Sequence, residues 1–171
     1  VMQLVQEGKL DLDAPVEQYL TRWHFRQPSR YDIEGVTIRR ILSHTAGLNV
    51  EGYGGTPLDE PIPTLEELLT QKGAALGLGG DPGRRFRYSG GGYLLLQLII
   101  EEVTGQPYED FTTERVLTPL GLTTSTVAWT ESDIPRTAQA YDRSEKPLPY
   151  VNHVAKASGG YFLSVDDLAR F

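Results

Sequence analysis

The sequence contains no cysteine, only one methionine and only three histidines. The lack of cysteine excludes disulfide bonds and thiolate metal sites, but it does not fix the cellular compartment. The histidines, His24, His44 and His153, stand far apart and form neither an HxxxH nor an HExxH pair. Because histidine ligands on one helix need such a spacing, we expect no metal site.

Basic residues are also scarce, and no apolar run is long. The sequence has 16 lysines and arginines against 23 aspartates and glutamates, which gives a formal net charge of -7. This balance argues against nucleic acid and against anionic membrane surfaces as partners. No apolar stretch approaches the ~20 residues that a membrane-spanning helix needs, so we expect no membrane span.

Several catalytic and cofactor motifs are missing as well. No serine lies in a G-x-S-x-G sequence, and no serine is followed by a lysine three residues later. A nucleophile elbow is therefore excluded, and no S-x-x-K or K-T-G sequence occurs. Neither a P-loop nor a G-x-G-x-x-G sequence is present, so we expect no nucleotide and no other cofactor.

The most prominent feature that is present is the apolar run Leu94–Val103. Its leucines and isoleucines cover nearly every direction around a helix, which is typical of a helix in the interior. Ser89 is a suitable N-cap, and Gly105 stands where a left-handed residue would end the helix. Residues 90–92 are three glycines, which cost about 1 kcal/mol each in a helix. That cost indicates that another part of the molecule approaches the backbone closely.

Amphipathic patterns and capping residues predict further short helices on both sides of this one. Strand signals are weak: residues 123–129 favour a short strand, and residues 132–156 favour either a long functional loop or a pair of short strands. We expect a tight turn at residues 158–161. The further helices are predicted from Val1 to Gly8, after an Asp13 cap, from a Thr37 cap to Gly47, after a Thr64–Glu67 capping box, from Pro107, and after a Ser164 cap.

This pattern predicts a mainly α fold with a few short strands. Residues 1–171 are expected to form a single helical domain or subdomain. Val1 already lies inside an amphipathic pattern, and the helix that reaches Phe171 has no C-cap. We therefore expect an internal piece of a longer protein, truncated at both ends.

Six sequence motifs, in order, resemble the serine β-lactamase-like family, which includes class C β-lactamases, D-alanyl-D-alanine carboxypeptidases and related esterases. The resemblance covers nearly the whole chain, and its strength lies in the series rather than in any single motif. The matching stretches are Val1–Val16, Ile41–Leu48 (similar to LLSHTSGL), Pro82–Tyr93 (similar to PG..F.YSN.GY), Val103–Gly105, Pro119–Leu122 and Ser158–Phe171 (similar to AGGL.ST..DLARF).

The resemblance implies the helical portion of the β-lactamase/transpeptidase-like α+β fold and acyl transfer to a serine, followed by hydrolysis. The family's nucleophilic serine and lysine would precede Val1. Its catalytic tyrosine matches Tyr88, which would act as general base. A free tyrosine has a pKa near ~10, so it needs a cationic neighbour to ionise at neutral pH. The family's substrate-binding asparagine matches Gly90, which favours ester hydrolysis over recognition of penicillins or peptide amides.

The remaining site residues follow from the same motifs. Ser89 would cap the helix and contribute to substrate binding. Gly159 and Gly160 would also contribute to substrate binding. His44, Thr45 and Gly47 would form a structural motif.

Two alternatives stay open at this stage. Tyr88 could instead be a buried phenol packed against Phe86. The chain could belong to a non-catalytic relative that binds a peptide or cell-wall ligand. The expected partner is a small-molecule or peptide substrate, and truncation would expose an apolar surface that allows self-association. The resemblance favours a periplasmic or extracellular location over a cytoplasmic one.

Overall fold

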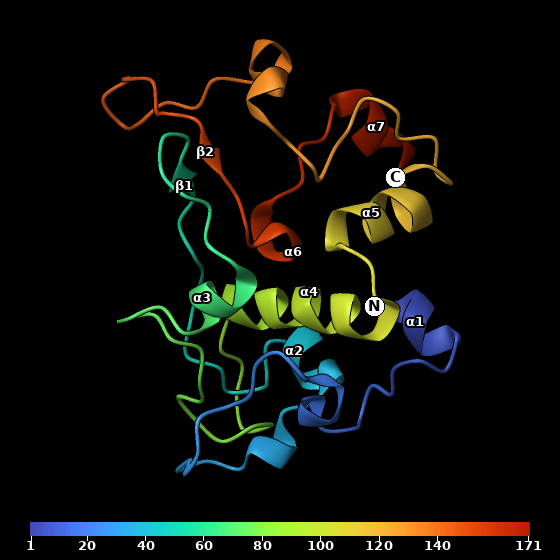
Figure 1. Ribbon diagram of the computed structural model, residues 1–171, viewed down its shortest axis with the longest axis vertical. Coiled ribbons are helices and arrows are strands. Elements are labelled where there is room, and N and C mark those ends of the chain that lie inside the picture. Colours follow the sequence, from blue (N-terminus) through green and yellow to red (C-terminus); the bar gives the residue numbers. More distant parts are fainter.

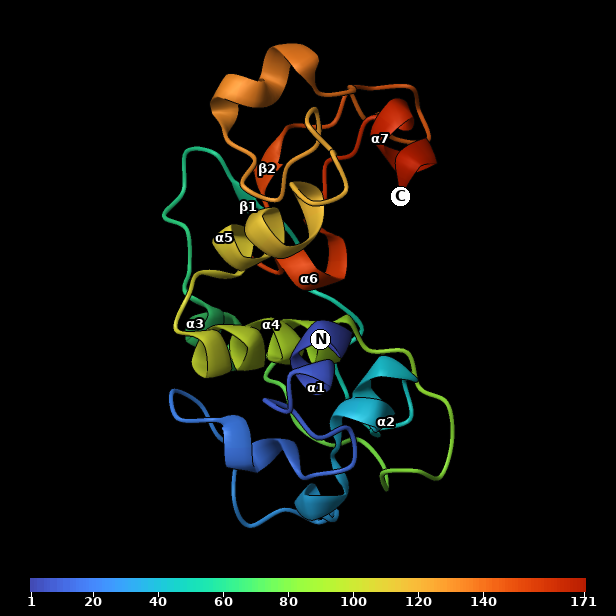
Figure 2. The same cartoon turned by 90° about the vertical axis from the view of Figure 1, so that its right-hand side faces the viewer.

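The longest helix, α4 (Gly90–Thr104), crosses the middle of the molecule in a computed structural model that describes residues 1–171. Helices α1 (Met2–Gln6) and α2 (Ile38–Leu42) lie on one side of it, and α5 (Tyr108–Thr112), α6 (Lys156–Gly159) and α7 (Val165–Arg170) lie on the other (Figures 1 and 2). Helix α4 contacts α2, α3 (Leu65–Leu69), α5 and α6. This central position agrees with the apolar character of all its faces.

Both ends of α4 lie where the sequence predicts them. The Ser89 hydroxyl accepts a hydrogen bond from the Gly92 amide over 3.1 Å and caps the first turn. Gly105 adopts a left-handed conformation with φ of 69° and ends the helix. The apolar side chains between them are almost completely buried, namely Leu94, Leu95, Leu96, Leu98, Ile99 and Ile100.

The glycines of the first turn are explained by the segment that follows α2. A Cβ atom on Gly90 would lie 2.6 Å from the carbonyl oxygen of Glu51. A Cβ atom on Gly91 would lie 2.8 Å from Leu76 and 2.9 Å from Val50. The Gly90 and Gly91 amides also donate hydrogen bonds to the carbonyl oxygens of Glu51 and Val50. The expected close approach to this backbone is therefore confirmed.

The other elements are short. The only paired strands are β1 (Thr56–Pro57) and β2 (Val151–Asn152), which run antiparallel with Thr56 opposite Asn152. The structure is thus mainly helical with two short strands, as predicted. The remaining helices are α3 (Leu65–Leu69), α5 (Tyr108–Thr112), α6 (Lys156–Gly159) and α7 (Val165–Arg170), with 3-10 helices at Val16–Tyr19, Ile33–Gly35 and Glu131–Arg136 and a π-helical turn at Thr113–Leu117.

Three predicted caps are confirmed. Thr37 caps α2, and Ser164 caps α7 through its hydroxyl. Thr64 and Glu67 form the complete capping box at α3. No helix is both long and apolar enough to cross a membrane.

Two predicted helix ends are wrong. Asp13 does not cap a helix, because its carboxylate pairs with Arg39 over 2.7 Å and the 3-10 helix begins only after Pro15. Helix α2 ends at Leu42, and His44 takes the left-handed conformation with φ of 54°. Gly47 lies beyond the helix end.

The predictions for the C-terminal third hold only in part. Residues 123–129 form no strand; Thr126 makes one isolated bridge to Phe162. Residues 132–156 are mostly loop, with most of the 3-10 helix Glu131–Arg136, one isolated bridge and β2. The predicted tight turn at residues 158–161 is wrong, because Ser158 and Gly159 belong to helix α6.

Candidate active site

Tyr88 lies one residue before the N-cap of α4, with its side chain 53% exposed. It therefore is not the buried phenol of the alternative interpretation. A cavity of about 150 Å³ opens beside it, and its walls come from three parts of the chain. The lining residues are Glu51, Gly52, Tyr53, Tyr88, Gly90, His153, Ala155, Ser158 and Gly159.

The structure brings together three residues that the sequence analysis singles out, Tyr88, Gly90 and Gly159. Tyr88 and Gly90 meet because they flank the helix N-cap. Gly159 joins them because α6 packs against α4. Residues that are about 70 positions apart in the sequence thus share one cavity.

Two other predicted residues lie behind the cavity wall. The Ser89 side chain is buried; its hydroxyl donates to the Val50 carbonyl over 2.6 Å and accepts from Gly92. Gly160 is also buried, and a Cβ atom there would lie 2.5 Å from the Cα of Lys156. Neither residue lines the cavity, so their expected contact with substrate stays a prediction.

The predicted structural motif lies next to Tyr88. The ring centroids of His44 and Tyr88 are 4.6 Å apart. The Thr45 hydroxyl lies 2.9 Å from the Ser43 hydroxyl. Gly47 packs against the backbone of Gly80, which leaves no room for a side chain.

The cavity has no lysine or arginine in its wall. Its ionisable side chains are Glu51, His153 and the phenols of Tyr53 and Tyr88. The Tyr53 hydroxyl is buried without a hydrogen-bond partner, and burial raises the pKa of this phenol to about 12. Tyr53 therefore stays protonated at neutral pH.

Sequence reasoning missed Glu51, Tyr53 and His153 as cavity residues. Glu51 and Tyr53 lie in a glycine-rich loop without a motif, and His153 also lies outside any recognisable motif. The pairing of β1 with β2 brings the two segments together, but strands of two residues leave no recognisable signal in the sequence. No group of three or more histidine, aspartate and glutamate side chains is arranged to hold a metal ion.

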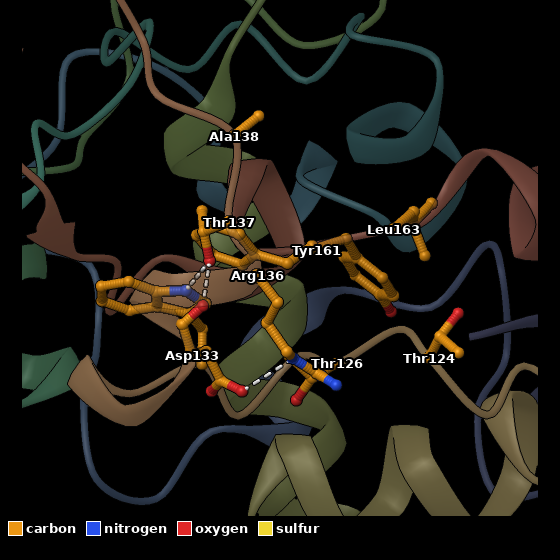
Figure 3. Close-up of a pocket in the computed structure, with 10 residues that line it drawn as sticks. Thr124, Thr126, Asp133, Arg136, Thr137, Ala138, Tyr161 and Leu163 are labelled. Carbon is orange, nitrogen blue, oxygen red and sulfur yellow. Dashed lines mark hydrogen bonds and ion pairs between the residues drawn. The ribbon is translucent and has the colours of Figure 1, made fainter. Parts of the chain in front are cut away.

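A second cavity, of about 290 Å³, lies between the loop that follows residue 123 and residues 161–163 (Figure 3). Asp133 and Arg136 point toward each other in it and form an ion pair of 3.2 Å. Trp129 donates to the Thr137 hydroxyl over 2.8 Å. The Tyr161 hydroxyl lies 3.0 Å from that of Tyr108. These polar groups pair with one another, and no predicted site residue is among them, so the cavity beside Tyr88 is the better candidate.

Known proteins are similar to this chain over its whole length. The family model described as "Beta-lactamase" matches residues 1–171. The protein named "Putative penicillin-binding protein PbpX" of Bacillus subtilis (strain 168) is 29% identical over 177 residues; the match covers 100% of this chain and 41% of that protein. The chain thus spans about two fifths of the length of this curated relative.

Solved structures share the fold of this chain. An octameric penicillin-binding protein homologue from Pyrococcus abyssi superposes with a TM-score of 0.71 at 31% identity, over 99% of this chain and 40% of that one. A D-amino acid amidase from Ochrobactrum anthropi SV3 superposes with a TM-score of 0.76 at 26% identity, over 99% of this chain and 48% of that one. Both superpositions include the helical core and the segments that wall the cavity.

Proposed function

The chain belongs to the beta-lactamase family, and on this basis we propose that it forms one wall of the active site of a serine hydrolase. The observation that carries the proposal is the exposed Tyr88 beside a cavity that also holds Gly90 and Gly159. The reaction is attack of a serine on an ester, amide or β-lactam, followed by hydrolysis of the acyl-enzyme. Tyr88 takes the proton of the serine and returns it to the leaving group.

The nucleophile and the cation are supplied from outside residues 1–171. No serine of the chain has a lysine three residues later, and no lysine or arginine lines the cavity. A nearby positive charge lowers the pKa of a phenol and so favours its ionised form. The chain alone is therefore inactive, and activity needs a Ser-x-x-Lys segment that faces Tyr88 across the cavity.

The cavity chemistry favours esters as substrates. Gly90 occupies the position where the family carries an asparagine, and a Cβ atom there would collide with the Glu51 carbonyl at 2.6 Å. No side chain at this position is available to bind the amide of a peptide or penicillin. The similarity to a D-amino acid amidase makes small amides the competing substrate class.

The test uses the protein that carries both this chain and the Ser-x-x-Lys segment. We expect phosphonylation of its serine by an activated phosphonate, with loss of the phosphonate's leaving group. We expect Tyr88→Phe to lower kcat on a chromogenic ester by roughly 100- to 10,000-fold. Tyr141→Phe is the matched control, because Tyr141 is 60% exposed and lies outside the cavity. Full activity of Tyr88→Phe would exclude Tyr88 as the base.

A non-catalytic relative on the same scaffold is the second candidate. The missing side chain at Gly90 is the feature that favours it, because this position would otherwise orient the substrate. Such a protein would bind a peptide or cell-wall ligand in the cavity but would not react with the phosphonate. Labelling with the phosphonate therefore separates the two functions.

Two further expectations complete the proposal. Membership in this family favours a periplasmic or extracellular location, which fractionation of the producing cells would test. Self-association of the isolated chain would use the exposed apolar side chains of α7, Val165 and Leu168, and the exposed Phe171 that follows the helix. Sedimentation of the chain across a range of concentrations would measure it.

A further inference from the structure

We propose that His44 is a positioning residue for Tyr88, acting through both its backbone and its neutral imidazole. The hydrogen bonds and ring contacts around His44 carry this inference. Its consequence for catalysis rests on the function proposed above, whereas its structural part does not.

The first observation is that His44 holds the residues on both sides of Tyr88. The Arg87 amide donates a hydrogen bond to the His44 carbonyl oxygen over 2.7 Å. The Ser89 amide donates a hydrogen bond to Nδ1 of the His44 ring over 3.2 Å. One residue thus fixes the backbone immediately before and immediately after Tyr88, so the direction in which Tyr88 leaves the backbone depends on it.

The second observation concerns the proton on the imidazole. A backbone amide can only donate, so Nδ1 must offer a lone pair to Ser89. The ring proton therefore lies on Nε2, and the imidazole is neutral in this arrangement. A proton on Nδ1 would face the Ser89 N–H and break the contact.

The third observation is the contact between the rings. The His44 ring lies 4.6 Å from the Tyr88 ring and 5.2 Å from the Tyr93 ring, and the interplanar angle with Tyr93 is 30°. Tyr93 is itself anchored, because its hydroxyl donates to the Leu42 carbonyl over 3.2 Å. The exposed ring of Tyr88 therefore packs against the His44 imidazole, which in turn packs against Tyr93 of α4.

The backbone at His44 indicates that this arrangement is specific. Its φ of 54° is left-handed, a conformation that costs a residue with a side chain roughly 1–2 kcal/mol. Glycine would remove this strain but would lose the imidazole. Asparagine is the informative replacement, since it tolerates the left-handed region and offers Oδ1 as an acceptor on a short side chain.

The experiment uses the chain 1–171, labelled with ¹⁵N, at neutral pH. Long-range ¹H–¹⁵N correlation spectra should show the His44 proton on Nε2. In His44→Ala we expect the Ser89 amide to exchange with solvent roughly tenfold faster, with changed Tyr88 ring shifts, while amides in the middle of α4 keep their protection. In His44→Asn we expect the Ser89 protection to return. His24→Ala, a change at an exposed histidine elsewhere, should leave Ser89 and Tyr88 unaffected.

A proton on Nδ1, or unchanged Ser89 exchange in His44→Ala, would overturn the proposal. If His44→Ala does not fold, the tautomer of the unaltered chain and the exchange rates in His44→Asn still decide it. In the active protein, His44→Ala should lower kcat with little change in KM, and His44→Asn should restore part of the rate. If Tyr88→Phe keeps full activity, the proposed function fails. The NMR results still test whether His44 positions Tyr88, because they do not depend on activity.

Discussion

Gln97, in the middle of α4, donates a hydrogen bond from Nε2 to the carbonyl oxygen of Val154 over 3.1 Å. Its Oε1 accepts a second hydrogen bond, from the Ala157 amide, also over 3.1 Å. The side chain is only 2% exposed, so one buried amide satisfies two backbone groups at the start of α6. This link fixes α6, and with it Gly159 in the cavity wall, to the central helix.

Replacement of Gln97 by leucine should therefore destabilise the protein. Gln97→Leu keeps the side-chain volume similar but leaves the Ala157 amide without a partner. It also removes one of the two hydrogen bonds to the Val154 carbonyl, which keeps the one from the Lys156 amide over 2.8 Å. We expect a loss of about 1–3 kcal/mol in the free energy of unfolding, measured by urea denaturation. Gln106→Leu, at an exposed position, should stay within about 0.5 kcal/mol of the original protein. Equal stability of the two variants would contradict this role of Gln97.

The two cavity glycines, Gly90 and Gly159, differ in the space around their Cα atoms, so we expect alanine to affect stability differently at each position. Gly90→Ala places a Cβ atom 2.6 Å from the Glu51 carbonyl, whereas Gly159→Ala meets no atom within 4 Å. We expect Gly90→Ala to lower the free energy of unfolding by about 1–3 kcal/mol. Gly159→Ala should change it by less than about 0.5 kcal/mol. Thermal or urea unfolding of the pair would test the close packing at the start of α4.

Asp167 should make stability depend on pH in the acid range. Burial acts to raise the pKa of this carboxyl, but hydrogen bonds from Ser125 and Thr124 outweigh it and hold the pKa below its ordinary value. The stabilisation is therefore complete above about pH 4 and is lost as the pH falls through the folded-state pKa. In Asp167→Asn the melting temperature should be lower at neutral pH and should depend less on pH below about 4. The matched change at its exposed neighbour, Asp166→Asn, should keep the original pH profile.

Removal of the Tyr53 hydroxyl should not lower the free energy of unfolding. This hydroxyl is buried without a partner, so Tyr53→Phe should leave the free energy of unfolding unchanged or raise it by up to about 1 kcal/mol. Burial raises the pKa of Tyr53 to about 12, so the unfolded chain releases this proton at lower pH than the folded one. Stability should then fall as the pH rises from about 10 to about 12, and it should fall less in Tyr53→Phe.

The contrasting change is Tyr108→Phe. The Tyr108 hydroxyl lies 3.0 Å from the Tyr161 hydroxyl, and the residue is 6% exposed. We expect this variant to lose about 1 kcal/mol of stability. Denaturation at neutral pH distinguishes the two tyrosines, and a larger loss in Tyr53→Phe than in Tyr108→Phe would be incompatible with these contacts.

Helix ends could be predicted from the sequence where a single capping residue determines them. Helix α4 begins after Ser89 and ends at Gly105, and α3 begins at the capping box of Thr64 and Glu67. These ends are predictable because a cap interacts only with the adjacent turn of its own helix. The three glycines of α4 indicated a close neighbour but could not identify it. The neighbour, residues 48–51, reaches the helix through long-range contacts.

Predictions failed where a distant partner competes for the same residue. Asp13 has the chemistry of a helix cap, but Arg39 binds its carboxylate instead. Gly47 has the conformational freedom to end α2, but His44 takes the left-handed position earlier because its ring and its carbonyl both hold the segment around Tyr88. The β-branched residues 123–129 favour a strand, yet only Thr126 finds a bridging partner.

The candidate site was partly foreseeable for the same reasons. Tyr88, Gly90 and Gly159 lie in motifs that resemble those of the family, and the structure places them in one cavity. Glu51, Tyr53 and His153 lie in no motif, and their positions depend on the packing of α6 and on the strand pair. Their part in the site could be found only from coordinates.

The antiparallel pair β1–β2 sets where this protein can tolerate insertions. The cavity residues 51–53 precede β1, and His153 follows β2, so both lie at the same end of the two-stranded ladder. The loops that leave its opposite end, after Pro57 and before Val151, point away from the cavity. Length changes in those loops leave the width of the cavity unaltered, whereas one added residue between Tyr53 and Thr56 would shift a wall. Homologues should therefore diverge in length beyond the ladder and stay constant in length on its cavity side.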